Sequence, residues 1–158
     1  MEFHDPEVIK SILTHYRSWA IVGASASQSR PSHGVMRFLD SLGYQVIPIN
    51  PNGNEVLGKK CFPSLTAASS EYDIEVVDVF RKPSEVEAIA LEAIAIGARA
   101  IWFQLGVVNT SAANTAKNGG LQVVMDTCPL IEIPKLGLSF DSWDKSSVQD
   151  KLRSTEEF

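Results

Sequence analysis

The sequence predicts a single α/β domain built on a parallel five-stranded sheet with helices on both faces. Segments of helical periodicity alternate with five short apolar runs, at residues 19–22, 45–49, 74–80, 100–103 and 122–125. Continuous apolar runs of this length are typical of strands that are covered on both sides. Because alternating strands and helices connect through right-handed crossovers, the strands should run parallel. We expect a Rossmann-like, doubly wound sheet with the strand order 3-2-1-4-5, numbered along the chain.

The first half of the chain should contribute two helices and two of the strands. Asp5 is suited to cap a first helix, whose apolar residues recur at helical spacing. Pro31 precedes a second helix, and Gly43 is suited to end it. The strand at residues 45–49 contains Pro48, which lacks an N–H. The register of this strand must therefore be one in which no neighbouring strand needs a hydrogen bond from residue 48.

The rest of the chain should contribute three further helices. One short helix is expected within residues 60–70. Residues 84–87, Ser-Glu-Val-Glu, match a capping box and predict a helix that ends at Gly97. A weaker, alanine-containing helix is expected at residues 109–118.

Length and composition favour one domain with a sizeable core. The 158 residues are 44% hydrophobic and 21% charged, which is ordinary for a globular protein. We expect the domain to span residues 1–140. Residues 141–158 are polar and lack an apolar stripe, so we expect a mobile tail there.

Charge and hydropathy argue against several classes of partner. The formal net charge is −5, whereas non-specific binding of nucleic acid requires a basic surface. No stretch approaches the roughly 20 apolar residues that span a bilayer, and no signal peptide is recognisable. Cys61 and Cys128 have no metal-ligand spacing and are interpreted as reduced cysteines. We therefore expect a cytoplasmic protein without nucleic-acid, membrane or metal binding.

A ligand site is expected at the carboxyl ends of the strands, where the strand order reverses. With the order given above, this rim lies after the first and fourth strands and is formed by residues 23–30, 50–51, 80–83, 104–106 and 126–129. Gly23 and its small neighbours allow a ligand to approach the backbone, and the following helix N-terminus favours a phosphate. The rim of this acidic chain also carries Arg30, Arg81 and Lys82, which suit a ligand with several phosphates.

Two features disfavour a nicotinamide dinucleotide as that ligand. The dinucleotide fingerprint needs glycines where Ser25 and Gln28 stand. No Asp or Glu occurs between Asp40 and Glu55, so the second strand ends without a carboxylate for a ribose diol.

Several segments occur in unbroken order from about residue 9 to residue 138 as they do in a known family. They are Val22-Gly23-Ala24-Ser25, Arg30-Pro31-Ser32, residues 43–51, residues 77–81, residues 104–109, Val124-Met125-Asp126, Cys128-Pro129 and residues 131–138. In these segments the chain resembles the small stand-alone bacterial CoA-binding domain proteins. That family is itself similar to the N-terminal CoA-binding domain of the succinyl-CoA ligase α subunit.

The resemblance implies coenzyme A as the ligand and places three loops against it. By correspondence, Gly23, Ala24 and Ser25 would face the phosphates, Asn50 and Pro51 the nucleotide, and Val79 and Phe80 the adenosine–pantetheine portion. Arg81 and Arg30 are expected as phosphate contacts from their position on the rim. The expected cofactor-binding residues are Gly23, Ala24, Ser25, Arg30, Asn50, Pro51, Val79, Phe80, Arg81, Gln104, Gly106 and Cys128.

No catalytic constellation is recognisable. The ligase carries its phosphorylated histidine in a second domain, whereas His4, His15 and His33 all precede the second strand here and are expected mainly on the surface. Asp78 and Asp126 belong to strands that are not expected to be neighbours, so they are interpreted as turn or loop anchors.

Three functions stay open for this sequence. The first, which we favour, is a non-catalytic module that binds CoA or an acyl-CoA. The alternatives are an enzyme acting on a nucleotide or thioester, and a regulatory module that binds another protein. Cys128 is interpreted mainly as a packing residue, but it could form a mixed disulfide with the CoA thiol.

Overall fold

A computed structural model describes residues 3–53 and 55–140, and the predicted tail at 141–158 lies outside them. The chain alternates strands and helices as expected. In order, the elements are α1 (Pro6–His15), β1 (Ser18–Val22), α2 (Pro31–Ser41), β2 (Gln45–Ile49), α3 (Leu65–Ser69), β3 (Val76–Val79), the short 3-10 helix η1 (Pro83–Glu85), α4 (Val86–Ala95), β4 (Ala100–Phe103), α5 (Thr110–Asn118), β5 (Gln122–Met125) and α6 (Pro129–Lys135). None of the helices in the described residues is long and apolar enough to cross a bilayer.

The five strands form one parallel sheet, which confirms the α/β doubly wound fold. The strand order, however, is 2-1-3-4-5, so the predicted order 3-2-1-4-5 is wrong. β3 lies between β1 and β4, and all four of its residues are buried. The strand order therefore reverses between β1 and β3, not between the first and fourth strands.

Pro48 explains why β2 lies at the edge of the sheet. A central strand needs an N–H toward each neighbour at alternate positions, and proline has none to give. On the outer side of β2 the chain returns at Phe62, which donates its N–H to the Pro48 carbonyl (2.9 Å). The Phe62 carbonyl in turn accepts from the Asn50 N–H (2.9 Å). The prediction had noted the missing donor but had still placed β2 in the interior.

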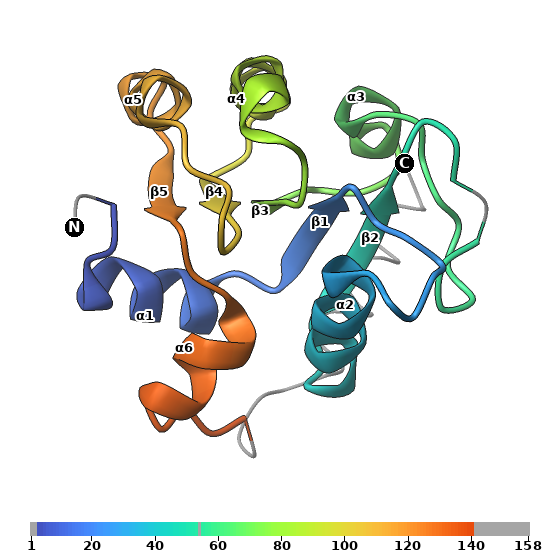
Figure 1. The fold of residues 1–158 in the computed structure, drawn as a ribbon, viewed down its shortest axis with the longest axis horizontal. Coiled ribbons are helices and arrows are strands. Elements are labelled where there is room, and N and C mark those ends of the chain that lie inside the picture. Colours follow the sequence, from blue (N-terminus) through green and yellow to red (C-terminus); the bar gives the residue numbers. More distant parts are fainter. Residues whose placement is uncertain (1–2, 54, 141–158) are drawn as a thin grey trace.

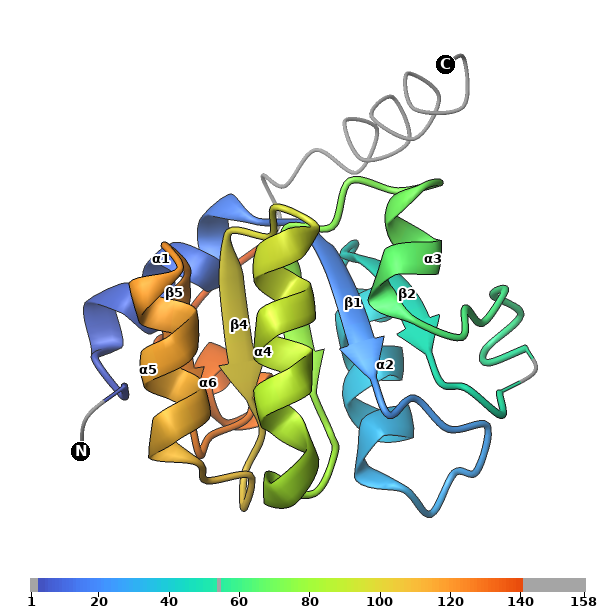
Figure 2. The same cartoon turned by 90° about the horizontal axis from the view of Figure 1, so that it is seen from above.

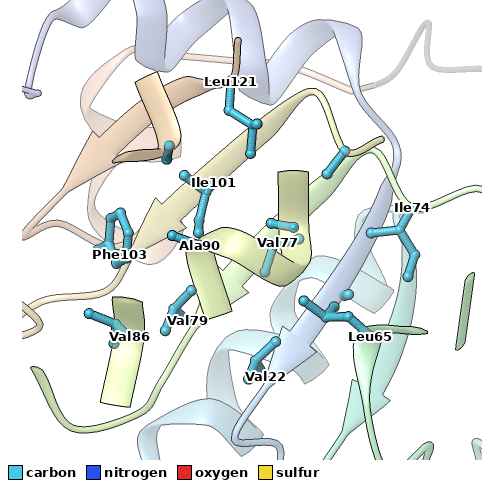
Figure 3. Packing of buried hydrophobic residues seen from close by; sticks show 14 of the residues in the cluster. Val22, Leu65, Ile74, Val77, Val79, Val86, Ala90, Ile101, Phe103 and Leu121 are labelled. Atoms are coloured by element: carbon cyan, nitrogen blue, oxygen red, sulfur yellow. The ribbon is translucent and has the colours of Figure 1, made fainter. Parts of the chain in front are cut away.

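Two apolar cores lie on opposite faces of the sheet (Figure 1). Helices α3, α4 and α5 cover one face and bury side chains such as Val77, Ile101 and Phe103, whose packing is seen in Figure 3. Helices α1, α2 and α6 cover the other face, where Trp19 and Trp102 are fully buried. Because each strand contributes to both cores, its sequence reads as a continuous apolar run.

The ends of the helices follow local signals only in part. Asp5 caps α1 as expected, accepting from the Glu7 N–H at 2.9 Å. The capping box expected at residues 84–87 does not form, because Pro83 starts a 3-10 turn and α4 begins only at Val86. Helix α6 was not predicted from periodicity. It is short and contains Pro134, which interrupts the usual helical pattern.

Candidate functional site

A pocket of about 840 Å³ opens at the carboxyl ends of the strands, where the strand order reverses. Figure 2 shows the arrowheads of β1, β2 and β4 pointing to the same end of the sheet. The pocket lies between the loops after β1, β2, β3, β4 and β5 and the first turns of α2 and α6. Its lining residues are Gly23, Ser25, Gln28, Ser29, Arg30, Pro31, Ser32, Gly34, Val35, Asn50, Phe80, Arg81, Gln104, Leu105, Val107, Cys128, Leu130 and Ile131.

The loop after β1 is held close to the loops after β2 and β3. The Gly23 and Ala24 N–H groups both donate to the Ile49 carbonyl, at 2.9 and 3.2 Å. The Asn50 amide donates back to the Ala24 carbonyl at 2.9 Å. Gly23 has φ +91°, and a Cβ at this position would lie 2.8 Å from the Phe80 carbonyl oxygen. Only glycine fits this turn, because both the backbone conformation and the neighbouring backbone oppose a side chain.

Several lining residues near the start of α2 combine features that suit an anion. Arg30 precedes α2 as its exposed N-cap residue, and its side chain makes no capping hydrogen bond. The N-terminus of α2 adds the positive end of the helix dipole. Ser25 and Ser29, in the loop that leads to α2, also line the pocket and bring hydroxyl groups. Together these groups offer positive charge and donors to a phosphate-bearing ligand.

Arg81 also lines the pocket, but a carboxylate already orients it. Its Nε donates to Glu85 Oε2 at 2.8 Å, and both side chains are about two-fifths exposed (38% and 41%). A guanidinium held by one edge keeps a fixed direction, which helps bidentate contact through its other nitrogens. Lys82, the third rim cation of the sequence analysis, is exposed and is not among the lining residues.

Two buried residues of the pocket lining, Gln104 and Cys128, form a cluster with Asp78, which lies behind them in β3. Asp78 in β3 is fully buried, Gln104 is 5% exposed and Cys128 is 8% exposed. The Gln104 amide lies 2.7 Å from Asp78 Oδ1 and also hydrogen bonds the Cys128 sulfur. Burial raises the pKa of the Asp78 carboxyl well above its usual value. Burial also raises the pKa of the Cys128 thiol, and the charge of an ionised Asp78 acts in the same direction. Hydrogen bonds from Gln104 and from the backbone of Leu130 and Ile131 lower this pKa.

Part of the pocket lining is apolar. Leu105 after β4 is 62% exposed, and Leu130 and Ile131 in the first turn of α6 are 41% and 46% exposed. Val107 lies beside them and is buried. Large apolar side chains that gather at a pocket and remain open to solvent mark a place where a ligand or partner docks.

Eight of the twelve predicted cofactor-binding residues line this pocket, namely Gly23, Ser25, Arg30, Asn50, Phe80, Arg81, Gln104 and Cys128. The other four do not line it. Ala24 and Val79 are buried in the two cores, at 1% and 0% exposure. Pro51 is exposed in the turn after β2. Gly106 donates its N–H to Asp126 Oδ1 at 2.8 Å, which makes Asp126 the loop anchor that was predicted.

Sequence reasoning missed helix α6 and one residue of α2, Gly34, as parts of the pocket. Leu130 and Ile131 belong to α6, which was not predicted as a helix. Gly34 lies within α2, lines the pocket, and would meet no atom within 4 Å if it carried a Cβ. A glycine inside a helix costs stability relative to alanine, so Gly34 was a usable signal that space is kept open there.

The histidines and cysteines form no cluster that could hold a metal ion in the described part of the chain. His33 is buried at 6% exposure, which corrects the expectation of a surface position. His4 contacts Glu132 of α6, with 3.3 Å between Nε2 and Oε2, and His15 is exposed. Cys61 and Cys128 are both free thiols. Within residues 3–53 and 55–140, no three His, Cys, Asp or Glu side chains gather as metal ligands would.

Comparison with known proteins gives relatives over most of this chain. The uncharacterized protein YneT of Bacillus subtilis (strain 168) is 38% identical over 120 residues, which are 76% of this chain and 87% of that protein. A solved structure of a hypothetical protein from Pyrococcus horikoshii OT3 is 40% identical, with a TM-score of 0.80 over 85% of this chain and 93% of that one. The ADP-forming acetate–CoA ligase of Methanocaldococcus jannaschii is 30% identical over 67 residues, which are 42% of this chain but 10% of the ligase.

The family described as CoA binding domain matches residues 17–134, from the residue before β1 almost to the end of α6. That span includes every strand and every residue that lines the pocket. The chain therefore belongs to the CoA-binding domain family.

Proposed function

We propose that the protein binds coenzyme A, or an acyl derivative of it, in the pocket at the switch point and catalyses no reaction of its own. The observation that carries the proposal is the polarity of the pocket. Arg30, Arg81 and the N-terminus of α2 bring positive charge to its lining, and Leu105, Leu130 and Ile131 bring exposed apolar side chains. Coenzyme A has the same polarity, with phosphates on the nucleotide and an uncharged pantetheine arm. Membership in the family supports this ligand.

The same site is poorly suited to a nicotinamide dinucleotide. At the end of β2, where such proteins place a carboxylate against the ribose, this chain has Asn50. The Asn50 side chain is occupied in holding two turns, because it donates to the Ala24 carbonyl and accepts from the Asn52 N–H, each at 2.9 Å. We therefore expect NAD and NADP to bind far more weakly than CoA.

Thermal unfolding with added ligand tests the proposal. CoA at 100 times its dissociation constant should stabilise the folded protein by about 2.7 kcal/mol, whereas NAD and NADP should leave the melting temperature unchanged. Equal shifts with NAD and CoA would contradict the assignment. Release of free CoA from an acyl-CoA by the purified protein would contradict the absence of catalysis.

Two variants and a matched control test whether Arg30 and Arg81 contact the phosphates of coenzyme A. Arg30→Ala and Arg81→Ala should each weaken CoA binding by about 1.5–3 kcal/mol, the usual worth of a charge-assisted contact, and should affect pantetheine much less. Arg37→Ala removes the same charge from the exposed side of α2, outside the pocket lining, and should bind CoA as the wild type does. Calorimetric titration gives these affinities. A loss for pantetheine as large as that for CoA would assign the effect to folding instead.

A further inference from the structure

The cluster of Asp78, Gln104 and Cys128 is not explained by ligand binding alone. A carboxyl group in the middle of an apolar sheet core is costly, and its nearest polar partner is an amide that faces the pocket. The amide in turn reaches the sulfur of Cys128. Asp78, Gln104 and Cys128 thus form a row of three buried polar groups that ends at a thiol on the pocket wall. Such a row can change the reactivity of the thiol toward a bound ligand.

The protonation of Asp78 determines which end of the Gln104 amide faces the sulfur. An ionised Asp78 accepts from the amide nitrogen, which turns the amide oxygen toward Cys128. A protonated Asp78 instead donates its O–H to the amide oxygen, which turns the amide N–H toward the sulfur. Burial raises the pKa of Asp78 and so extends to higher pH the range over which the second arrangement is available. An N–H directed at the sulfur stabilises the thiolate, the reactive form of cysteine.

The position of Cys128 in the pocket matches the reactive end of the proposed ligand. With the phosphates at Gly23 and Arg30, the uncharged pantetheine arm is expected to pack on the apolar part of the lining, which Val107, Leu130 and Ile131 form. Cys128 is the N-cap residue of α6, the helix that carries Leu130 and Ile131, and also lines the pocket. The thiol of coenzyme A, at the far end of the arm, is thereby brought toward the Cys128 thiol.

We propose that Cys128 is a covalent attachment site for the thiol end of coenzyme A, and that Gln104, held by Asp78, is the positioning residue that activates it. The reaction is thiol–disulfide exchange with CoA disulfide. The Cys128 thiolate attacks one sulfur of the disulfide, a Cys128–CoA disulfide forms, and one CoA leaves as its thiolate. No net oxidation occurs, because one disulfide is consumed and one is made. The inference rests on the proposed function, since the pocket must first bind the CoA moiety.

The test is to incubate the protein with CoA disulfide and to measure the adduct by intact and peptide mass spectrometry. The adduct should map to Cys128, its rate should saturate with CoA disulfide concentration, and reduced CoA should compete. Glutathione disulfide, which lacks the nucleotide, should react far more slowly at this residue. Cys61→Ser is the matched control and should form the adduct at the wild-type rate, whereas Cys128→Ser should form none.

Variants of the other two residues test the positioning role. Asp78→Asn keeps a donor toward the Gln104 oxygen and should retain the exchange rate. Gln104→Met keeps the bulk but removes the N–H, and should slow exchange near neutral pH and shift its pH profile to higher pH. Because desolvation raises the pKa of Cys128, the rate should rise toward alkaline pH in every reactive variant. An unchanged pH profile in Gln104→Met would refute the role of the amide.

Calorimetry with reduced CoA separates the two proposals. The titration uses the wild type under reducing conditions, so that it measures non-covalent binding alone. If reduced CoA binds but the adduct is absent, or forms on Cys61 alone, covalent attachment is overturned and the binding function stands. If reduced CoA does not bind, both proposals are overturned.

Discussion

Gly23 shows how much one residue contributes to the geometry of the pocket. Its positive φ turns the chain out of β1 and lets the loop pass directly against the Phe80 carbonyl. A side chain here would push the loop away from the loop after β3, and both loops line the pocket. The residue therefore sets the spacing between the two sides of the switch point.

Gly23→Ala should destabilise the protein and weaken CoA binding together. We expect a loss of about 1–3 kcal/mol in the free energy of unfolding, because the left-handed backbone and the 2.8 Å approach to Phe80 both oppose a Cβ. Gly34→Ala is the control for stability, since its Cβ meets nothing within 4 Å and a helical alanine is favoured by up to about 1 kcal/mol. Urea unfolding measures the stability of both variants, and calorimetric titration measures their affinity for CoA. A Gly23→Ala protein as stable as the wild type would contradict this reading of the turn.

Asp78 should make the stability of the fold depend on pH. Its pKa is raised in the folded state by burial, so the folded protein keeps a proton that the unfolded chain releases above about pH 4. The stability from burying a neutral carboxyl is thus complete below that pH and is lost as the pH rises toward the folded pKa. The slope reaches at most about 1.4 kcal/mol per pH unit.

Asp78→Asn, which does not titrate, removes this contribution and provides the comparison. The difference in the free energy of unfolding between the wild type and this variant should change in favour of the variant as the pH rises. Urea unfolding at a series of pH values measures it. Parallel curves for the two proteins would show that Asp78 is ionised in both states.

At the scale of elements, α4 and α5 pack closely at a glycine. A Cβ on Gly119, the C-cap residue of α5, would come within 2.7 Å of Ile94 Cγ1 on α4. Gly119→Ala should therefore cost about 1–3 kcal/mol of stability through overpacking. In an Ile94→Ala background the same substitution should cost much less, because the obstructing side chain is gone. A double-mutant cycle by chemical denaturation measures this coupling, and a coupling near zero would contradict the contact.

Elements that are determined by nearby residues could be predicted from the sequence, whereas elements that depend on contacts with distant parts of the chain could not. The strands were predictable because burial on both faces leaves a continuous apolar run, as in residues 100–103. Helix α1 was predictable from its cap at Asp5 and its apolar stripe. Helix α6 was not, because Pro134 and its seven-residue length hide the period, and its position depends on packing against α1 and α2. The two apolar residues that it brings to the pocket were missed with it.

At the scale of the whole molecule, the fold class was predictable and the strand order was not. The order depends on which face each crossover takes, and α2 takes the opposite face from α3. Pro48 carried the one local signal that β2 lies at an edge. The prediction of the site residues was little affected by this error, because the loops after β1 and β3 carry the same residues whichever strands lie beside them. Most of the pocket, Gln104 and Cys128 included, could therefore be predicted from the loops, whereas the contact of Gln104 with the buried Asp78 depends on how β3 and β4 pair.

The contacts at the two outer strands have a consequence for how the protein behaves in concentrated solution. An exposed strand edge can recruit a strand from another molecule and so begin aggregation. Here Pro48 withholds a donor from the β2 edge, and Phe62 occupies backbone groups of the same edge. At the opposite edge, the Phe3 carbonyl accepts from the Met125 N–H of β5 at 2.9 Å. The sheet thus limits its own lateral growth with two short pieces of its own chain.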